Sequence, residues 1–181
     1  MARLPYLDVE DLAPENQELL KRNINLHRML VHSPAGARSF AGIGQWIRFE
    51  SRLDPRLREL AILQVGYLTR CAYEYSHHLR IGRDFGITDD DVRALIAETE
   101  GRDSGLPVLD RAVLRAAREM TEGLTIADPT FAELQAELDE ERLVDLVVII
   151  SFYCAVVRLL TTLRIDVEPS YQPYLDAFPL P

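Results

Sequence analysis

The chain has 181 residues, which is the length of one domain, since single domains typically run to about 100–200 residues. Twenty basic side chains against 29 acidic ones give a net charge of −9. This balance argues against a broad nucleic-acid or anionic-membrane surface, which needs a basic face. The only two cysteines, Cys71 and Cys154, exclude a disulfide framework and a cysteine-rich zinc site. The open question is whether either cysteine takes part in chemistry.

Two features of the chain bear on its location. Residues 1–8 lack the apolar stretch of about 7–15 residues that a secretory signal needs. The longest apolar run, residues 146–157, is shorter than the roughly 20 residues that span a bilayer. We therefore expect a buried core helix there, and a cytoplasmic protein with reduced thiols and no membrane partner.

The apolar residues recur at helical spacing along the chain. Leu57, Leu60 and Ala61 show this spacing, and no stretch alternates with period two as a half-buried strand does. The sequence therefore predicts an all-α fold. The expected helices cover residues 14–22, 25–32, 35–50, 55–69, 71–85, 89–98, 107–122, 129–137 and 140–163.

Capping residues mark several of these boundaries. Ser33, Asp54 and Asp128 each precede a proline, which is the pattern of an N-cap followed by the first helical residue. The segment 88–91 resembles a capping box, with Asp91 in the place of the usual glutamate. Gly86 before this segment predicts a helix end.

The regions between and after these helices are expected to be irregular. Residues 97–107 contain two glycines and a proline and predict the longest loop. Four prolines follow Glu168, so the tail is expected to be extended. Tyr171 and Phe178 are too apolar for a free tail, and we expect it to pack on its own subunit or on a neighbour.

One predicted helix brings together three groups of different chemistry. Cys71 lies near the helix start, where the helix dipole and free N–H groups favour a thiolate. Glu74 and His78 follow one and two turns later, and the three positions fall within about 60° on one face. Tyr75 joins that face. The spacing predicts that thiol, carboxylate and imidazole converge.

Glu59 is a candidate partner for this cluster from the preceding helix. It lies in an almost wholly apolar run, and a buried carboxylate is costly unless it is paired. A Glu–His pair can relay protons, and a cysteine beside it can act as nucleophile or proton donor. The alternatives are a small buried hydrophobe for Cys71, and a salt bridge from Glu59 to Arg56 or Arg58.

The remaining candidates have more ordinary interpretations. Tyr73 and His77 point away from the face of Cys71 and are candidates for shaping a pocket, and His77 is expected at the surface or an interface. His27 and His32 are also expected at the surface or an interface. Cys154 lies among apolar residues and is expected in the core.

Metal and cofactor motifs are incomplete. Glu74 and His77 form a single Glu-x-x-His, whereas di-iron bundles use two with further carboxylates. Glu74 and His78 supply only two of the ligands that a metal site needs. Gly42-Ile43-Gly44 lacks the third glycine of a dinucleotide fingerprint. We expect neither a metal nor a cofactor.

The spacing of these residues resembles a known superfamily. Glu59, Cys71 and His78, followed by Gly-Ile-Thr-Asp-Asp-Asp-Val at 86–92, resemble the carboxymuconolactone decarboxylase / alkylhydroperoxidase D-like superfamily. The resemblance covers about residues 40–125 of a single domain at 1–181, with a C-terminal helix and tail at 140–181. It implies an all-helical fold and a homo-oligomer: a trimer, a hexamer or a dimer.

The resemblance also implies roles for individual residues. Glu59, Cys71 and His78 match the glutamate, first cysteine and distal histidine of the alkylhydroperoxidase D branch, which uses a thiol proton relay. Its second cysteine falls on Glu74 and its intervening histidine on Tyr73. The sequence therefore looks like a subgroup with Tyr-Glu-(Trp/Tyr)-x-x-His in place of the cysteine pair. A redox cycle would need an external thiol reductant or Cys154.

Three functions follow as hypotheses. The leading one is a cofactor-independent, peroxiredoxin-type enzyme that reduces hydroperoxides through Cys71, with Glu59 and His78 as the relay and Glu74 and Tyr73 shaping the site. The second is a decarboxylase or isomerase that acts on a small cyclic (lactone) carboxylic acid through Glu74 and His78. The third is a non-enzymatic oligomeric binding protein. The first two imply a small-molecule substrate.

Overall fold

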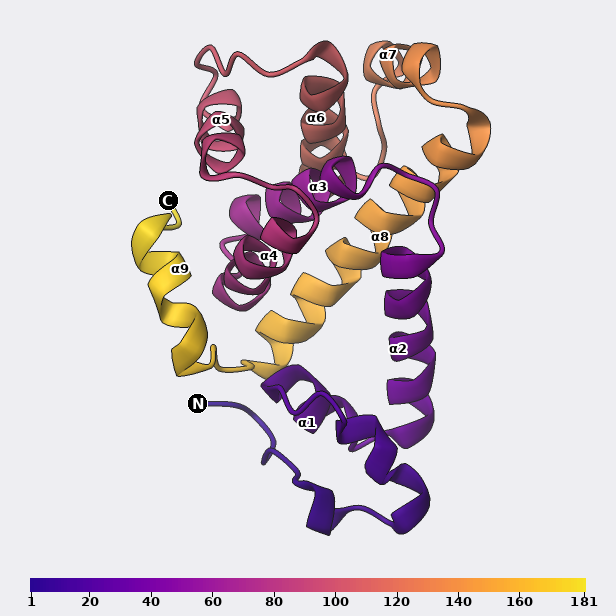
Figure 1. Ribbon diagram of the computed structural model, residues 1–181, viewed down its shortest axis with the longest axis vertical. Helices are drawn as coiled ribbons and strands as arrows, with labels where there is room; N and C mark the ends of the chain where they lie inside the picture. The colour runs from indigo at the N-terminus through magenta and orange to yellow at the C-terminus, as the bar shows by residue number, and fades with distance from the viewer.

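The computed structural model describes all residues from 1 to 181 and is built from helices without a β-strand. The predicted all-α, single-domain fold is confirmed. Figure 1 shows the helices in chain order. The nine α-helices are α1 (Asn25–Leu30), α2 (Pro34–Phe49), α3 (Pro55–Leu68), α4 (Ala72–Asp84), α5 (Asp89–Thr99), α6 (Val108–Glu122), α7 (Asp128–Glu137), α8 (Glu140–Leu163) and α9 (Gln172–Ala177), with 3₁₀ turns at Val9–Asp11, Pro14–Leu20 and Pro169–Tyr171.

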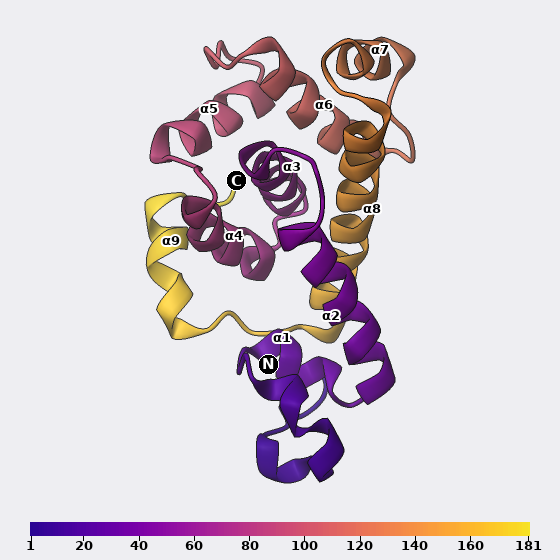
Figure 2. The same cartoon turned by 45° about the vertical axis from the view of Figure 1, so that its right-hand side comes forward.

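Helix α3 is the centre of the fold. It begins after Asp54, whose side chain accepts hydrogen bonds from the N–H groups of Arg56 and Leu57. Every residue from 57 to 67 is buried. Figure 2 shows why, because α4, α5, α6 and α8 surround α3. A polar side chain on this helix therefore has no route to bulk water and must find its partners inside the protein.

Helices α3 and α4 pack closely because of a glycine. A Cβ on Gly66 would lie 3.2 Å from backbone atoms of Tyr75, so a larger residue would push the helices apart. Helix α3 ends with Arg70 in the left-handed conformation, at a φ of 51°. The N–H of Cys71 then bonds the carbonyl of Gly66 at 3.0 Å. Helix α4 starts directly after this turn and runs back along α3.

Helix α8 supplies the other long wall of the core. It has 24 residues, and its most apolar window has a mean hydropathy of 2.3, enough by length and composition alone to cross a membrane. Half of that window is buried inside the fold, as in the core helix of a globular domain. The expectation that residues 146–157 form a core helix agrees with this packing, since Leu146, Ile149 and Ile150 are fully buried.

The C-terminal tail is helical, so the expected extended tail is wrong. Pro169 and Pro173 lie in the first turns of a 3₁₀ turn and of α9, where a missing N–H costs nothing. The expectation of packing is confirmed on the same subunit: α9 lies along α4 (Figure 1), and only 6% of Phe178 is exposed.

The predicted helix boundaries hold with small differences. The Thr88 capping box forms as predicted, with Asp91 as the reciprocal partner. The segment expected as a helix at 14–22 is a 3₁₀ turn. Asp128 is the first residue of α7 rather than its N-cap, and Ser33 makes no capping hydrogen bond. Neither difference changes which faces of the helices are buried.

Candidate active site

A row of four ionisable side chains crosses the interface between α3 and α4. Arg58 Nε lies 3.0 Å from Glu59 Oε1, and Glu59 Oε2 lies 2.6 Å from His78 Nδ1. His78 Nε2 lies 3.0 Å from Glu74 Oε1. All four residues are buried. The predicted Glu59–His78 pair is present, and the alternative partner, Arg58, occupies the second oxygen of the same carboxylate.

The two carboxylates keep His78 protonated. Burial lowers the pKa of His78, but the charges and hydrogen bonds of Glu59 and Glu74 outweigh it and raise the pKa to about 9. Burial raises the pKa of Glu59, but the neighbouring His78 and Arg58 outweigh it and hold it below its ordinary value. At neutral pH, His78 is therefore an imidazolium whose two N–H groups each face a carboxylate.

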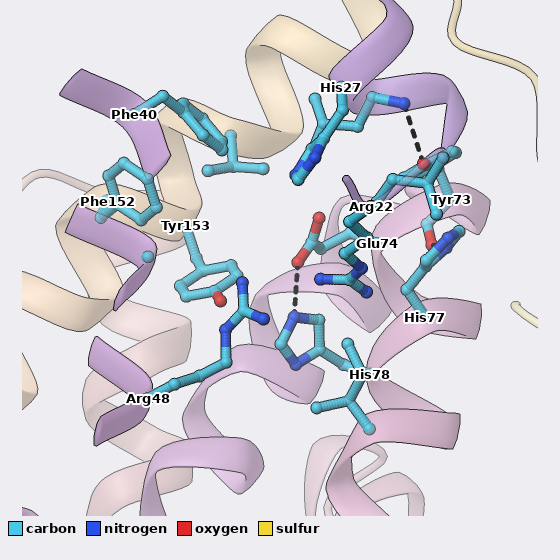
Figure 3. Close-up of a pocket in the computed structure, with 15 residues that line it drawn as sticks. Arg22, His27, Phe40, Arg48, Tyr73, Glu74, His77, His78, Phe152 and Tyr153 are labelled. Atoms are coloured by element: carbon cyan, nitrogen blue, oxygen red, sulfur yellow. Dashed lines mark hydrogen bonds and ion pairs between the residues drawn. The ribbon is translucent and has the colours of Figure 1, made fainter. Parts of the chain in front are cut away.

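The outer end of this row opens into a cavity between α1, α2, α4 and α8. The cavity has a volume of about 50 Å³ and is partly open to solvent. Figure 3 shows Glu74 and His78 joined by their ion pair at its side. Glu59 and Arg58 lie behind His78 and do not line the cavity. The polar and aromatic lining residues are Arg22, His27, Phe40, Arg48, Tyr73, Glu74, His77, His78, Phe152 and Tyr153.

Cys71 does not reach this cavity. It is the N-cap of α4, with φ and ψ of −81° and 90°, and it is buried. Burial raises the pKa of its thiol to about 11; the backbone N–H of Glu74 acts in the opposite direction. The predicted convergence of thiol, carboxylate and imidazole is therefore only partly present. Glu74 and His78 meet at the cavity, but the thiol of Cys71 lies outside its lining.

Tyr75 also lies away from the cavity. Its ring is completely buried against Tyr67, with the ring centroids 5.7 Å apart. Its hydroxyl has no hydrogen-bond partner, and burial raises its pKa. Tyr75 therefore packs α4 against α3 and does not contact the acid–base groups.

Tyr73 and His77 form a second cluster at the rim of the cavity. Tyr73 Oη accepts a hydrogen bond from the N–H of Leu26 at 3.0 Å and donates to Glu168 Oε1 at 3.0 Å. His77 Nε2 lies 3.2 Å from Glu168 Oε2, and its ring stacks between Tyr73 and Tyr171. The expectation of a surface or interface His77 is wrong, because only 3% of it is exposed. The cluster ties α1, α4 and the tail together.

Six of the polar and aromatic lining residues are not predicted as site residues from the sequence, and four of these six bear on the chemistry. Arg22 precedes α1, and Arg48 lies near the end of α2. Tyr153 on α8 packs edge-on against the His78 ring, with centroids 5.1 Å apart. His27, expected at the surface, is half-buried in the cavity wall, and burial together with Arg22 and Arg48 lowers its pKa to about 4. These residues come from separate elements, and no local spacing connects them to α4.

The remaining histidine and cysteine have simple environments. His32 Nε2 lies 2.8 Å from the carbonyl oxygen of Pro5 near the surface. Cys154 is buried in the core, as predicted, beside the hydroxyl of Thr121. No three His, Cys, Asp or Glu side chains lie close enough together to hold a metal ion.

Comparison with known proteins agrees with this architecture. Residues 34–119 match the model of the Carboxymuconolactone decarboxylase family. No curated protein matches the chain in sequence. A peroxidase-related protein from Ralstonia eutropha with an alkylhydroperoxidase AhpD core is 18% identical over 96% of this chain and 95% of its own, with a TM-score of 0.80.

Two further solved structures share the fold. The debrominase Bmp8, in complex with 2,3,4-tribromopyrrole, is 17% identical over 97% of this chain and 98% of its own, with a TM-score of 0.77. A peroxidase-related protein from a Silicibacter species is 17% identical over 93% of this chain and 92% of its own, with a TM-score of 0.70. The segment 34–119 is thus similar to the Carboxymuconolactone decarboxylase family, and the whole chain shares the alkylhydroperoxidase D-like fold of these solved structures.

Proposed function

We propose that the protein is a cofactor-independent enzyme that transfers protons to and from a small carboxylic acid, as a decarboxylase or an isomerase does. The observation that carries the proposal is the hydrogen-bonded row Glu59–His78–Glu74, whose outer carboxylate lines the cavity. A group at the cavity that is backed by a buried relay can exchange a proton with a substrate and recover its charge state. From the sequence alone, this function is the alternative to a thiol peroxidase.

The two ends of the row suit different tasks. Glu74 is the group that would contact the substrate, as a base that accepts a proton or, once protonated, as the acid that returns it. His78 carries a proton at neutral pH and donates toward Glu74. Glu59 stabilises that charge from behind, Arg58 holds the Glu59 carboxylate in place, and both act as positioning residues. A proton can therefore move from Nε2 of His78 to Glu74 without either group leaving its hydrogen bond.

In a decarboxylation, the electrons of the breaking C–C bond would pass into a conjugated carbonyl as carbon dioxide leaves. The resulting carbanion or dienolate then takes one proton, which Glu74 would deliver and His78 would replace. In an isomerisation, Glu74 would remove a proton beside the carbonyl and return it to another carbon. Tyr153, whose pKa burial raises above its ordinary value, stays neutral and could donate a hydrogen bond to the developing oxyanion.

Solvent deuterium provides the test. In D₂O, the enzyme should release carbon dioxide from carboxymuconolactone and place one deuterium on a carbon of the dienolate that remains. An isomerase would instead exchange deuterium into small lactone acids without releasing carbon dioxide. Glu74→Gln and His78→Gln should each slow the reaction by about 10²–10⁴-fold, whereas Glu98→Gln, which changes a carboxylate outside the cavity, should leave it unchanged. If the protein releases no carbon dioxide and exchanges no deuterium with any such acid, the proposal is contradicted and a binding protein is favoured.

A thiol peroxidase is the second candidate, and the position of Cys71 supports it. The thiol lies at the start of α4, where the backbone N–H groups of Tyr73 and Glu74 favour a thiolate. Its attack on a hydroperoxide would give a sulfenic acid and an alcohol, and an external dithiol would have to restore the thiol. Against it stand the raised pKa of the thiol and its place outside the cavity lining. Hydroperoxide turnover with a dithiol that Cys71→Ser abolishes would favour this candidate.

The homo-oligomer expected from the resemblance stays a prediction. Ile43 on α2 and Val144 and Val148 on α8 form an exposed apolar face beside a shallow hollow. An apolar face of this kind is typical of subunit contacts. Light scattering on the purified protein should give a mass two, three or six times that of one chain, and the mass of one chain would contradict it.

A further inference from the structure

The cavity contains two positive charges that have no internal partner. Arg22 and Arg48 both line it, and Figure 3 shows their guanidinium groups pointing toward the space next to the His78 ring, one beside Glu74 and the other beside Tyr153. No carboxylate lies within ion-pair distance of either, including Glu74, which pairs with His78. Most other arginines with partly buried side chains in this protein are paired, as Arg56 and Arg118 are.

The charge balance of the surroundings leaves these two arginines uncompensated. Arg58, Glu59, His78 and Glu74 alternate in sign and sum to zero when His78 is protonated. The lowered pKa of His27 agrees with a positive potential here, since burial and then the charges of Arg22 and Arg48 cause it. A net charge of about +2 thus faces a small cavity in a protein whose overall charge is −9. Such a site concentrates anions.

The shape of the site restricts which anion fits. A volume of about 50 Å³ is well below the roughly 150 Å³ of a cavity that admits benzene, so it holds a head group rather than a whole ring. A side hollow of about 360 Å³ shares Arg22, His27 and Phe40 with the cavity and continues over apolar residues such as Leu30 and Val31. Planar guanidinium groups match the two oxygens of a carboxylate.

We infer that Arg22 and Arg48 form a binding site for the carboxylate of a small organic acid, whose apolar body extends into the side hollow. This assignment rests on the proposed function, because it places the carboxylate beside Glu74 and His78, where the proton transfer would occur. It also explains why the protein keeps two half-buried guanidinium groups without partners. A neutral hydroperoxide would leave both of them unpaired.

Binding of a matched pair of probes tests the assignment without any turnover. Titration calorimetry with 2-furoate and its neutral isostere 2-furamide should show at least tenfold tighter binding of 2-furoate. Arg22→Gln and Arg48→Gln should each weaken 2-furoate binding at least tenfold and leave 2-furamide unchanged. Arg102→Gln removes an exposed arginine that pairs with Glu100 outside the cavity, and it should change neither. A thermal melt of each variant confirms that it is folded.

Three results would overturn the inference: equal binding of the two probes, unchanged 2-furoate binding in both cavity variants, or tighter binding of inorganic phosphate than of 2-furoate. The last result would make the cavity a phosphate site. Arginine-dependent binding of 2-furoate without any turnover of lactone acids would support this site and contradict the proposed function. Turnover that depends on His78 but not on Arg22 or Arg48 would support the proposed function and contradict this carboxylate site.

Discussion

Glu59 Oε2 on α3 and His78 Nδ1 on α4 lie 2.6 Å apart in the interior of the protein, and the other oxygen of Glu59 bonds Arg58. Each partner depends on the other, because an unpaired charge at this depth is far less stable than a paired one. The pair also fixes the rotation of the imidazole, so that its Nε2 faces Glu74. The buried part of the site thus positions the part that lines the cavity.

Removing the charge of Glu59 should therefore destabilise the whole protein. Glu59→Gln leaves the buried guanidinium of Arg58 without a counter-charge, and we expect a loss of about 3–5 kcal/mol in the free energy of unfolding. Glu100→Gln breaks an exposed pair with Arg102 and should cost about 0–1 kcal/mol. Urea denaturation measures both values. A loss for Glu59→Gln no larger than for Glu100→Gln would show that the interior pair contributes little.

The pKa of His78 predicts how stability depends on pH. Because its pKa rises from about 6.5 in the unfolded chain to about 9 in the folded protein, its contribution is complete below pH 6.5. It is lost as the pH rises through 9, by an amount on the order of 3 kcal/mol. Urea denaturation between pH 6.5 and 9 should show this decline in a Cys71→Ser background, which removes the thiol titration. In His78→Gln the decline should disappear, and an equal slope in both proteins would contradict the assignment.

The close approach of α3 and α4 makes a prediction with a matched control. A methyl group at Gly66 would lie 3.2 Å from the backbone of Tyr75, so Gly66→Ala should cost about 1–3 kcal/mol. Gly42 lies exposed on α2 with no atom within 4 Å of its would-be Cβ. Gly42→Ala should be neutral or stabilise the protein by up to about 1 kcal/mol, through helix propensity alone. Thermal and urea unfolding measure the stability of both variants. Equal effects of Gly66→Ala and Gly42→Ala would contradict the close packing of α3 and α4.

Alkylation of Cys71 tests whether its thiol is activated. In a Cys154→Ala background, the pH profile of reaction with iodoacetamide should have its midpoint near the pKa of about 11. At pH 8 the folded protein should react about 100-fold more slowly than a free cysteine, because little thiolate is present. The same protein unfolded in urea serves as the control and should react at the ordinary rate. A midpoint below 8 would identify an activated thiol and favour the peroxidase.

The sequence predicts the helices and the Glu59–His78 pair for one reason. Both rest on local rules, namely helical periodicity, capping residues and the need of a buried carboxylate for a partner. The prediction that Cys71 converges with Glu74 and His78 is wrong, also for a local reason. As an N-cap with a ψ of 90°, Cys71 lies outside the helix, so the angle of 100° per residue does not give the direction of its side chain.

The rest of the site depends on how distant segments pack. Arg22, Arg48 and Tyr153 come from a loop before α1, from α2 and from α8, and the sequence carries no spacing that relates them to His78. The phenol of Tyr153 within an apolar helix is the one local signal that could have been followed. The helical tail could also have been predicted, because Pro169 and Pro173 fit the first turn of a helix as well as an extended chain.

The most direct test of the central claim compares three variants on one substrate. The value of kcat/KM for carboxymuconolactone should fall by about 10²–10⁴-fold in Glu74→Gln and in His78→Gln, and by less than twofold in Cys71→Ser, because the thiol lies outside the cavity. This result would establish that Glu74 and His78 carry the chemistry. A loss in Cys71→Ser as large as in His78→Gln would contradict the account and move the chemistry to the thiol.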